Sequence, residues 1–215
     1  MLNPRQKYLQ IAFNRDIEEV KTMISALPSS ENILVEAGTP FIKKYGAGGI
    51  SRIKDWWGGY VVADLKTMDR GSDEVEMAAQ SGASAVTCLG LAPVPTIDGF
   101  IKECSARGLD SMLDMMNIQF PFEILQQLKK MPTAVVLHRG VDEADDRNRA
   151  IPYYDINRIR ATYPLFISIA GGETTREVMR AFFNDANIAV VWRSFYDNPS
   201  QTRELAKEFL AETEK

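Results

Sequence analysis

Short apolar runs alternate with amphipathic segments along the chain, and the alternation recurs eight times. The runs are nearly continuous in apolar and β-branched residues and are bounded by Gly, Pro or polar residues, which is typical of strands buried on both faces. We expect strands at Tyr8–Asn14, Ile33–Ala37, Tyr60–Leu65, Ala85–Leu89, Ser111–Met115, Ala134–His138, Leu165–Ala170 and Ile188–Trp192.

Between these runs, apolar residues recur with the spacing of a helix. We expect helices that include Ile17–Ala26, Ser72–Ser81, Ile97–Arg107, Phe122–Lys130, Thr174–Asn184 and Ser200–Glu212. Asp16 and Ser72 stand where their side-chain oxygens would cap the first turn of a helix. Strands that alternate with helices predict βαβ units and a parallel sheet.

Eight such units in 215 residues give about 27 residues per unit, which fits a compact (β/α)₈ TIM barrel. The alternative is a doubly wound open sheet, which usually carries a glycine-rich fingerprint where this chain has Asn14, Arg15 and Asp16. No linker or charge block divides the sequence, so we expect one domain over residues 1–215. A polar loop is expected at Asp142–Arg149.

Composition narrows the classes of partner. The formal net charge is −4 and no Lys/Arg cluster occurs, which argues against a nucleic-acid-binding protein. The longest uncharged stretch, Met77–Ile97, contains Gln, Gly and Pro and does not read as a membrane span. Cys88 and Cys104 match no metal or redox spacing, and the first residues lack a secretory signal pattern. We expect a cytoplasmic protein without a membrane partner.

Polar residues stand at or just after the carboxyl ends of the expected strands, where the functional residues of parallel barrels cluster. They are Asn14, Glu36, Asp64, Lys66, Asp69, Asp114, His138, Arg139, Gly171, Gly172 and Arg193. Asp64 and Lys66 lie two positions apart and project to one face of their strand. A lysine held charged by an acid suits stabilisation of an enolate oxygen, although the bare pattern also fits a surface salt-bridge cluster.

Two further features suit chemistry on a phosphorylated substrate. His138 is the only histidine, and its ordinary pKa of about 6.5 suits proton transfer near neutrality, although a lone histidine is more often a packing residue. Gly171 and Gly172 would let backbone N–H groups approach an anion before a helix, and Arg193 offers a bidentate fork. A simple tight turn is the alternative for the two glycines.

Several strings, in order along nearly the whole chain from about Tyr8 to Arg193, resemble 3-hexulose-6-phosphate synthases. They are Val35–Pro40, Ala63–Asp69, Glu74–Ala79, Val86–Gly90, His138–Glu143 and Ala170–Gly172. The wider relatives of that family are the 3-keto-L-gulonate-6-phosphate decarboxylases and the orotidine-5′-phosphate decarboxylases.

The resemblance implies roles for particular residues. Glu36 and Asp64 are similar to the ligands and supports of a Mg²⁺ ion that chelates oxygens of a sugar phosphate, in keeping with the preference of Mg²⁺ for carboxylate oxygen. Lys66 would stabilise an enediolate, and His138 would transfer a proton. Asp69 would reach the neighbouring subunit's site, which implies a homodimer with shared active sites.

The resemblance also implies which residues bind the substrate. Gly171, Gly172 and Arg193 are similar to the phosphate-binding residues of the family, and Asp114 would handle protons or substrate hydroxyls. Three positions depart from the family pattern: Asn14 replaces an acid, Trp192 replaces a glycine, and Arg139 replaces a small residue.

These residues lead us to expect a Mg²⁺-dependent aldehyde-lyase that joins formaldehyde and ribulose 5-phosphate, or runs in reverse, through an enediolate. Because a cation such as Arg139 could hold a carboxylate, decarboxylation of 3-keto-L-gulonate 6-phosphate is an alternative. Decarboxylation of orotidine 5′-phosphate is a weaker one, because Arg70 and Gly71 follow Asp69. A non-catalytic sugar-phosphate-binding barrel is the third, motivated by Asn14 and Trp192.

Overall fold

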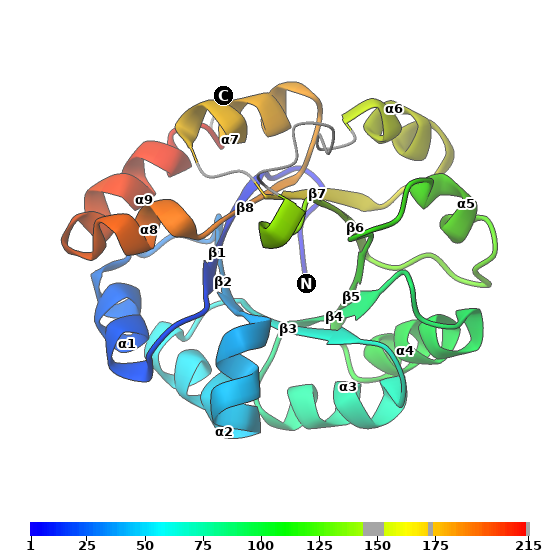
Figure 1. Cartoon of the computed structure of the whole chain (residues 1–215), viewed down its shortest axis with the longest axis horizontal. Helices are drawn as coiled ribbons and strands as arrows, with labels where there is room; N and C mark the ends of the chain where they lie inside the picture. The colour runs from blue at the N-terminus through cyan, green and yellow to red at the C-terminus, as the bar shows by residue number, and fades with distance from the viewer. Residues whose placement is uncertain (144–152, 172–173, 214–215) are drawn as a thin grey trace.

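The strands form a closed parallel barrel in a computed structural model that describes residues 1–143, 153–171 and 174–213. Each strand pairs with its neighbours in sequence, and β8 pairs with β1 (Figure 1). The strands are β1 (Tyr8–Phe13), β2 (Ile33–Ala37), β3 (Val61–Thr67), β4 (Ala85–Leu89), β5 (Asp110–Asp114), β6 (Ala134–His138), β7 (Phe166–Ala170) and β8 (Ile188–Val191). The predicted (β/α)₈ barrel is therefore confirmed, and closure excludes the open sheet.

Helices surround the barrel on its outer side (Figure 1). The α-helices are α1 (Ile17–Ala26), α2 (Thr39–Trp57), α3 (Gly71–Gln80), α4 (Val94–Ala106), α5 (Pro121–Leu125), α6 (Tyr153–Thr162), α7 (Thr175–Phe183), α8 (Arg193–Asp197) and α9 (Thr202–Leu210). Two short 3₁₀ turns, η1 (Val141–Glu143) and η2 (Pro199–Gln201), stand before α6 and α9. Within the described residues, no helix is long and apolar enough to cross a bilayer.

Alternation along the strands sorts side chains into two apolar clusters. In β2, Ile33, Val35 and Ala37 belong to the larger cluster of the core, whereas Leu34 belongs to the smaller one. The smaller cluster fills the inside of the barrel, and its strand residues are Tyr8, Ala12, Leu34, Val62, Ala85, Met112, Ala134, Val136, Ala170, Ile188 and Val190. This filled interior supports whatever side chains lie above it at the carboxyl ends of the strands.

The first residues of the chain meet the amino-terminal ends of the strands. Leu2 packs into the inner cluster, and its backbone N–H donates to Asp110 Oδ2 at 3.0 Å. The Tyr60 hydroxyl donates to the same oxygen at 2.7 Å. The N-terminus accordingly lies within the ring of strands in Figure 1, and these bonds satisfy a buried carboxylate at the end opposite the expected site.

Several helix predictions need correction. Asp16 caps α1 as expected, but Ser72 lies inside α3, which starts after Arg70 in a left-handed conformation (φ 54°) without a side-chain cap. The predicted helix Phe122–Lys130 is shortened to α5, because the chain beyond it tightens into turns with hydrogen bonds three residues apart. Of the predicted loop Asp142–Arg149, only the first two residues lie among those described.

Three helices were not predicted: α2, α6 and the short α8. In α2, Gly46 adopts φ 60° and ψ −156° and interrupts the helix, and two more glycines follow at 48 and 49. Glycine lowers helix propensity and leaves gaps in the apolar pattern, so the sequence signal for α2 is weak. The segment that forms α6 is strongly polar, and its apolar face is correspondingly narrow.

Candidate active site

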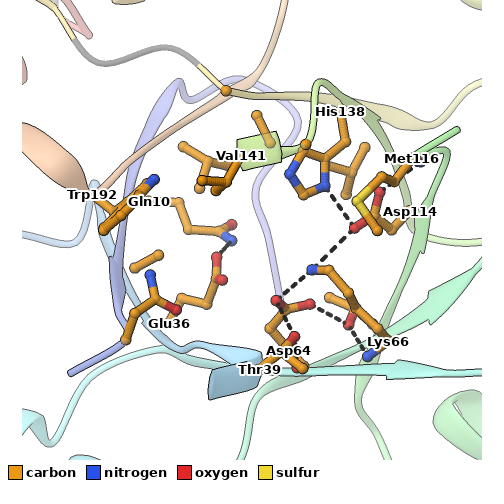
Figure 2. A pocket seen from close by; sticks show the side chains of 18 of the residues that line it. Gln10, Glu36, Thr39, Asp64, Lys66, Asp114, Met116, His138, Val141 and Trp192 are labelled. Atoms are coloured by element: carbon orange, nitrogen blue, oxygen red, sulfur yellow. Dashed lines mark hydrogen bonds and ion pairs between the residues drawn. The ribbon is translucent and has the colours of Figure 1, made fainter. Parts of the chain in front are cut away.

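A cavity of about 430 Å³ opens at the carboxyl ends of the strands. Along a strand, every second side chain points into the barrel. Leu34 and Met112 lie in the apolar inner cluster, and two residues further along each strand the inward side chain is polar: Glu36 on β2 and Asp114 on β5. Figure 2 shows these side chains converging on the cavity. Its lining residues are Gln10, Ala12, Asn14, Glu36, Thr39, Pro40, Asp64, Lys66, Thr87, Asp114, Met116, Val136, His138, Arg139, Gly140, Val141, Ala170, Gly171, Val190 and Trp192.

Asp64 is buried in β3, one residue past the last regular pair with β4, and both of its carboxylate oxygens accept hydrogen bonds. Oδ2 lies 2.6 Å from Lys66 Nζ and 2.7 Å from Thr39 Oγ1, at the start of α2. Oδ1 accepts a hydrogen bond of 2.7 Å from Thr87 Oγ1 on β4. Three side-chain atoms, Lys66 Nζ, Thr39 Oγ1 and Thr87 Oγ1, therefore fix the Asp64 carboxylate.

The backbone of β3 is irregular where it supplies these two residues. Ala63 pairs with Val86 on β4, but the next paired residue of β3 is Thr67, opposite Cys88. Lys66 lies within this bulge and has φ 49°, a left-handed conformation that is uncommon outside glycine. Strained backbone of this kind clusters at functional sites, where the surroundings hold it in place.

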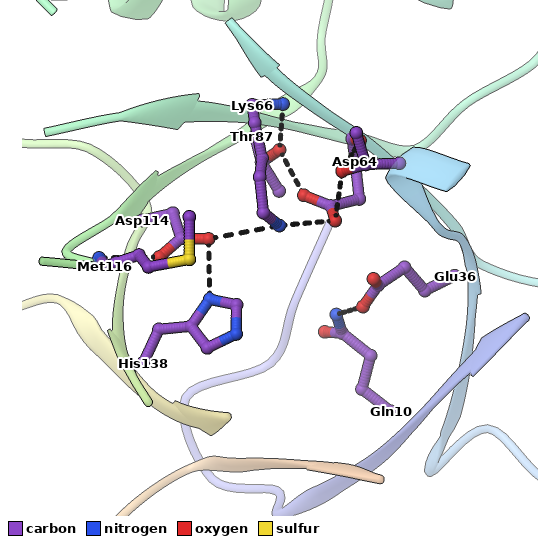
Figure 3. Close-up of polar contacts among 9 residues, drawn as sticks. Gln10, Glu36, Asp64, Lys66, Thr87, Asp114, Met116 and His138 are labelled. Carbon is purple, nitrogen blue, oxygen red and sulfur yellow. Dashed lines mark hydrogen bonds and ion pairs between the residues drawn. The ribbon is translucent and has the colours of Figure 1, made fainter. Parts of the chain in front are cut away.

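Asp114 at the end of β5 links Lys66 to His138 at the end of β6. Asp114 Oδ2 lies 3.3 Å from Lys66 Nζ and 2.8 Å from His138 Nδ1, and Oδ1 accepts from the backbone N–H of Met116 at 2.9 Å. An ionised Asp114 orients the imidazole with hydrogen on Nδ1. The other ring nitrogen, Nε2, then faces the open space of the cavity opposite Gln10 (Figure 3).

The pKa values of these three groups support a charged network. Burial alone would lower the pKa of Lys66, but the carboxylates of Asp64, Asp114 and Glu36 raise it above its ordinary value. Burial would raise the pKa of Asp114, but His138 and Lys66 hold it below its usual value. Burial would lower the pKa of His138, and Asp114 more than offsets this, so that pKa is raised. Lys66 is therefore cationic and Asp114 anionic at neutral pH.

Glu36 stands apart from this network on β2. Among the described residues its hydrogen-bond partner is Gln10 on β1, whose Nε2 donates to Glu36 Oε2. The second amide atom, Gln10 Oε1, is buried without a hydrogen-bond partner among those residues. Burial, followed by the negative charge of Asp64, raises the pKa of Glu36 to about 7.

Glu36 and Asp64 could together hold a hard cation. Both are buried carboxylates on the cavity wall, and the charge of Asp64 disfavours ionisation of Glu36, a conflict that a divalent cation would relieve. The described residues contain no group of three or more His, Cys, Asp or Glu side chains suited to a metal. This donor set fits Mg²⁺, which usually takes one or two carboxylates and keeps waters or substrate oxygens.

The opposite part of the cavity offers cationic and backbone groups. Arg139 follows β6, and its Nη2 donates to the Gly171 carbonyl at 2.8 Å, while its Nε is buried without a partner among the described residues. Gly171 has φ 102°, and a Cβ there would lie 2.6 Å from the Arg139 carbonyl oxygen, so the turn after β7 requires glycine. This corner suits an anionic group of a ligand.

Asn14 and Trp192 complete the rim near β1 and β8. Asn14 lies against Gly38, where a Cβ would come within 2.0 Å of Asn14 Oδ1, and its backbone N–H donates to Tyr196 Oη at 2.9 Å. The Trp192 indole lines the cavity and packs edge-on to Tyr196, with ring centroids 6.1 Å apart. Trp192 therefore narrows the cavity at the end of β8.

Not every predicted site residue reaches this cavity. Asp69 is exposed beyond the end of β3 and accepts the backbone N–H of Arg70 at 2.8 Å, outside the cavity lining. Arg193 is the first residue of α8, and its guanidinium carbon lies 5.4 Å from the Trp192 ring centroid. Gly172 falls outside the described residues. The other predicted residues all line the cavity.

Three polar lining residues escaped the sequence analysis: Gln10, Thr39 and Thr87. Gln10 and Thr87 have a detectable signal, because each is a polar residue at an inward position of an otherwise apolar strand. Thr39 gives no such signal, since it belongs to the start of a helix that the sequence did not predict.

Comparison with known proteins shows the family of this chain. The family model of orotidine 5′-phosphate decarboxylase / HUMPS matches residues 7–208. The chain belongs to this family. The bifunctional enzyme Fae/Hps of Methanosarcina barkeri is 40% identical over 207 residues, which are 94% of this chain and 52% of that relative. The chain thus spans about half the length of the curated relatives it matches.

Solved structures also superpose on the chain. A 3-hexulose-6-phosphate synthase has a TM-score of 0.82 and 27% identity, and the match covers 95% of this chain and 99% of that one. The 3-keto-L-gulonate-6-phosphate decarboxylase (KGPDC) of Streptococcus mutans has a TM-score of 0.80 and 17% identity, covering 98% of each chain. The second likeness shows the fold alone, whereas the family assignment confirms the resemblance seen in the sequence.

Proposed function

We propose that this family member is a carbon–carbon lyase of the 3-hexulose-6-phosphate synthase type, which joins formaldehyde to ribulose 5-phosphate or catalyses the reverse cleavage. The proposal is supported by the relatives that carry the Hps name and by the likeness to a solved synthase. The observation that carries it is the contact of a cation, an acid and an imidazole, Lys66, Asp114 and His138, in one cavity.

In this mechanism His138 Nε2 takes a proton from C1 of ribulose 5-phosphate, because Asp114 holds the imidazole through Nδ1. The electron pair left at C1 delocalises into the C2 carbonyl, and the Lys66 ammonium stabilises the enediolate oxygen. C1 then forms a bond to the carbon of formaldehyde, whose oxygen becomes an alkoxide and takes up a proton. The product is a 3-hexulose 6-phosphate, and the reverse direction breaks the same bond.

Glu36 and Asp64 would hold the Mg²⁺ ion. When bound, the ion would supply positive charge beside the oxygens of the sugar phosphate. Arg139 and the backbone near Gly171 would bind the anionic end of the substrate. Arg193 and Gly172 remain predicted phosphate ligands, and Asn14 a predicted substrate contact.

We also propose a cytoplasmic homodimer with shared active sites. Asp69 is exposed beside Met68, which is 47% exposed, at the rim of the barrel and outside its own cavity. An acid and an apolar side chain in this place suit contact with the cavity of a second copy. Mixed dimers test this: a subunit with Asp69→Ala and a subunit with Lys66→Met should regain part of the wild-type activity when combined.

Decarboxylation of a keto-sugar acid phosphate is the second candidate, and Arg139 favours it. Arg139 lines the same cavity as His138 and donates to the Gly171 carbonyl, and its guanidinium could hold the carboxylate that leaves as CO₂. Loss of CO₂ gives the same type of enediolate, so Lys66 keeps its role. Trp192 and Asn14 motivate the third candidate, a barrel that binds a sugar phosphate without turnover.

One experiment separates these candidates. The protein is incubated with Mg²⁺ in parallel with ribulose 5-phosphate plus formaldehyde, with 3-keto-L-gulonate 6-phosphate, and with orotidine 5′-phosphate. Formaldehyde consumption supports the synthase, and CO₂ release supports a decarboxylase. Ligand binding without either reaction supports the non-catalytic barrel. Activity that survives EDTA would contradict the metal dependence, and wild-type turnover by His138→Ala would contradict the mechanism.

A further inference from the structure

In the bulge of β3, a short stretch of backbone lacks the regular hydrogen bonds to β4, so another group must stabilise it. Between the pairs Ala63–Val86 and Thr67–Cys88, three residues of β3 lie opposite a single residue of β4, Thr87. An extra residue in a strand is left without its ladder partner, and its N–H group needs another acceptor when it is buried.

Thr87 supplies that acceptor with its side chain. The backbone N–H of Lys66 donates to Thr87 Oγ1 at 2.9 Å, and the same hydroxyl donates to Asp64 Oδ1 at 2.7 Å (Figure 3). Thr87 is buried on the cavity wall, and its Oγ1 lies between the two residues that carry the charge of β3. One oxygen atom thus connects the main chain of Lys66 to the side chain of Asp64.

The direction of both hydrogen bonds is fixed by chemistry. A backbone N–H can only donate, and an ionised carboxylate can only accept. The hydroxyl has one hydrogen and must therefore accept from Lys66 and donate to Asp64. Because Oδ1 of Asp64 is engaged in this way, Oδ2 is the oxygen that meets Lys66 Nζ and Thr39.

We propose that Thr87 is the positioning residue of this site: its hydroxyl holds Lys66 in the left-handed conformation and, at the same time, sets the rotation of the Asp64 carboxylate. Thr87 touches neither substrate nor reacting atoms in this role. The inference deepens the proposed function, on which its consequence for activity rests. Its structural part concerns the Lys66 amide and is independent of any substrate.

The test compares Thr87→Val with Thr87→Ser. Valine keeps the shape of threonine and removes the hydroxyl, whereas serine keeps the hydroxyl and removes the methyl group. We expect Thr87→Val to lower kcat for C1 exchange of ribulose 5-phosphate by about 10- to 100-fold, the size seen when supporting hydrogen bonds at active sites are lost. KM should change far less, and Thr87→Ser should recover most of kcat.

Amide hydrogen exchange provides the second readout. In Thr87→Val, exchange of the Lys66 amide should accelerate at least about tenfold, because the hydroxyl that accepts its hydrogen bond is gone. Amides of strands away from the bulge, such as those of the β6–β7 ladder, should keep their wild-type rates. If valine does not yield folded protein, Thr87→Ala serves instead, since it removes the hydroxyl without adding bulk to the cavity wall.

The results for Thr87→Val and Thr87→Ser either support or overturn the positioning role of Thr87. Wild-type kcat together with unchanged Lys66 exchange in Thr87→Val overturns the proposal. Equal losses in the Val and Ser variants also overturn it, because they would show that packing matters rather than the hydroxyl. If the wild-type protein itself does not exchange the C1 proton, the proposed function fails, while the Lys66 amide still reports whether Thr87 holds the bulge.

Discussion

The two walls of the cavity differ in how their charges are balanced. On one wall, Asp64, Lys66, Asp114 and His138 form an unbroken chain of ion pairs and hydrogen bonds across β3, β5 and β6. On the other wall, Glu36 meets only the neutral amide of Gln10 in the contacts that the structure describes (Figure 3). The first wall is complete in the protein alone, and the second carries an uncompensated carboxylate.

This difference shows which part of the site is preorganised and which part awaits a ligand. A buried charge with partners keeps its charged form, as the lowered pKa of Asp114 shows. A buried charge without a cation shifts toward its neutral form, as the pKa of Glu36 shows by rising to about 7. The paired wall, formed by Asp64, Lys66, Asp114 and His138, is suited to proton transfer. The unpaired wall, formed by Glu36 and Gln10, is suited to receive a cation.

Removing the cation of the paired wall should have the largest effect on activity and on the free energy of unfolding. Lys66→Met removes the cation shared by Asp64 and Asp114, and activity should fall by about 10³-fold or more because enediolate stabilisation is lost. Leaving two buried acids without their partner should also cost about 3 kcal/mol in the free energy of unfolding. Initial rates and urea unfolding measure the two effects.

The control for this prediction is Lys44→Met. Lys44 also forms an ion pair, with Asp16 at 3.3 Å, but its side chain is 60% exposed. Exposed pairs contribute little because water and salt screen them. Comparable losses of stability in the two variants would contradict the distinction between a buried network and a surface pair.

Neutralising the unpaired wall should make the protein more stable while removing function. The pKa of Glu36 is about 7 in the fold against 4.5 as its ordinary value. The folded state therefore disfavours ionisation of Glu36, and the free energy of unfolding falls as the pH rises from about 4.5 through about 7. Glu36→Gln should gain up to about 3 kcal/mol at pH 8 and little at pH 5, with weaker Mg²⁺ binding.

Urea unfolding at both pH values, with Glu31→Gln as an exposed control, tests this prediction. The control should show no pH-dependent gain, because Glu31 is exposed and does not line this cavity. A Glu36→Gln protein that is destabilised at pH 8 would contradict the view that its charge lacks compensation.

The paired wall can also be weakened without removing its base. The charge of Asp114 raises the pKa of His138, so Asp114→Asn should lower that pKa. The neutral imidazole is the form that accepts a proton, and the rise of activity with pH should therefore move to lower pH. His138 is the only histidine, so its imidazole can be titrated by NMR without overlap from other residues. An upward or absent shift would contradict the pairing.

The smallest effect is expected from Gln10→Met on the unpaired wall. The amide donates to Glu36 and favours its ionised form, so its loss should raise the pKa of Glu36 further. The expected cost at pH 8 is about 1 kcal/mol in the free energy of unfolding, typical of one hydrogen bond. An unchanged titration of Glu36, followed by carboxyl NMR, would show that the bond does not act on its charge.

The barrel could be predicted from the sequence because buried parallel strands give a strong local signal. All eight predicted strands are present, and their ends agree with the observed ends to within one or two residues. The sequence also predicted most of the cavity, since the carboxyl ends of parallel strands meet on one face. It did not find Gln10, Thr39 or Thr87. Gln10 and Thr87 are visible as polar residues of apolar strands, but the role of Thr87 depends on a bulge of the neighbouring strand, and Thr39 lies at the start of a helix that was not predicted.

Two predicted residues show the other limit of sequence analysis. Arg193 follows a strand as expected, yet it belongs to the start of α8 and lies beside Trp192 rather than in the cavity lining. Asp69 lies two residues past the end of β3 and is exposed. The position of a residue after a strand end depends on the local turn of the chain, which strand periodicity does not specify.

The most direct test of the paired wall is exchange of the C1 proton of ribulose 5-phosphate in D₂O, followed by proton NMR with and without Mg²⁺. Exchange reports formation of the enediolate before formaldehyde or any other partner is needed. We expect Mg²⁺-dependent exchange in the wild-type protein, with loss of exchange in His138→Ala. Bound ribulose 5-phosphate that keeps its C1 proton, or equal exchange by His138→Ala, would contradict it.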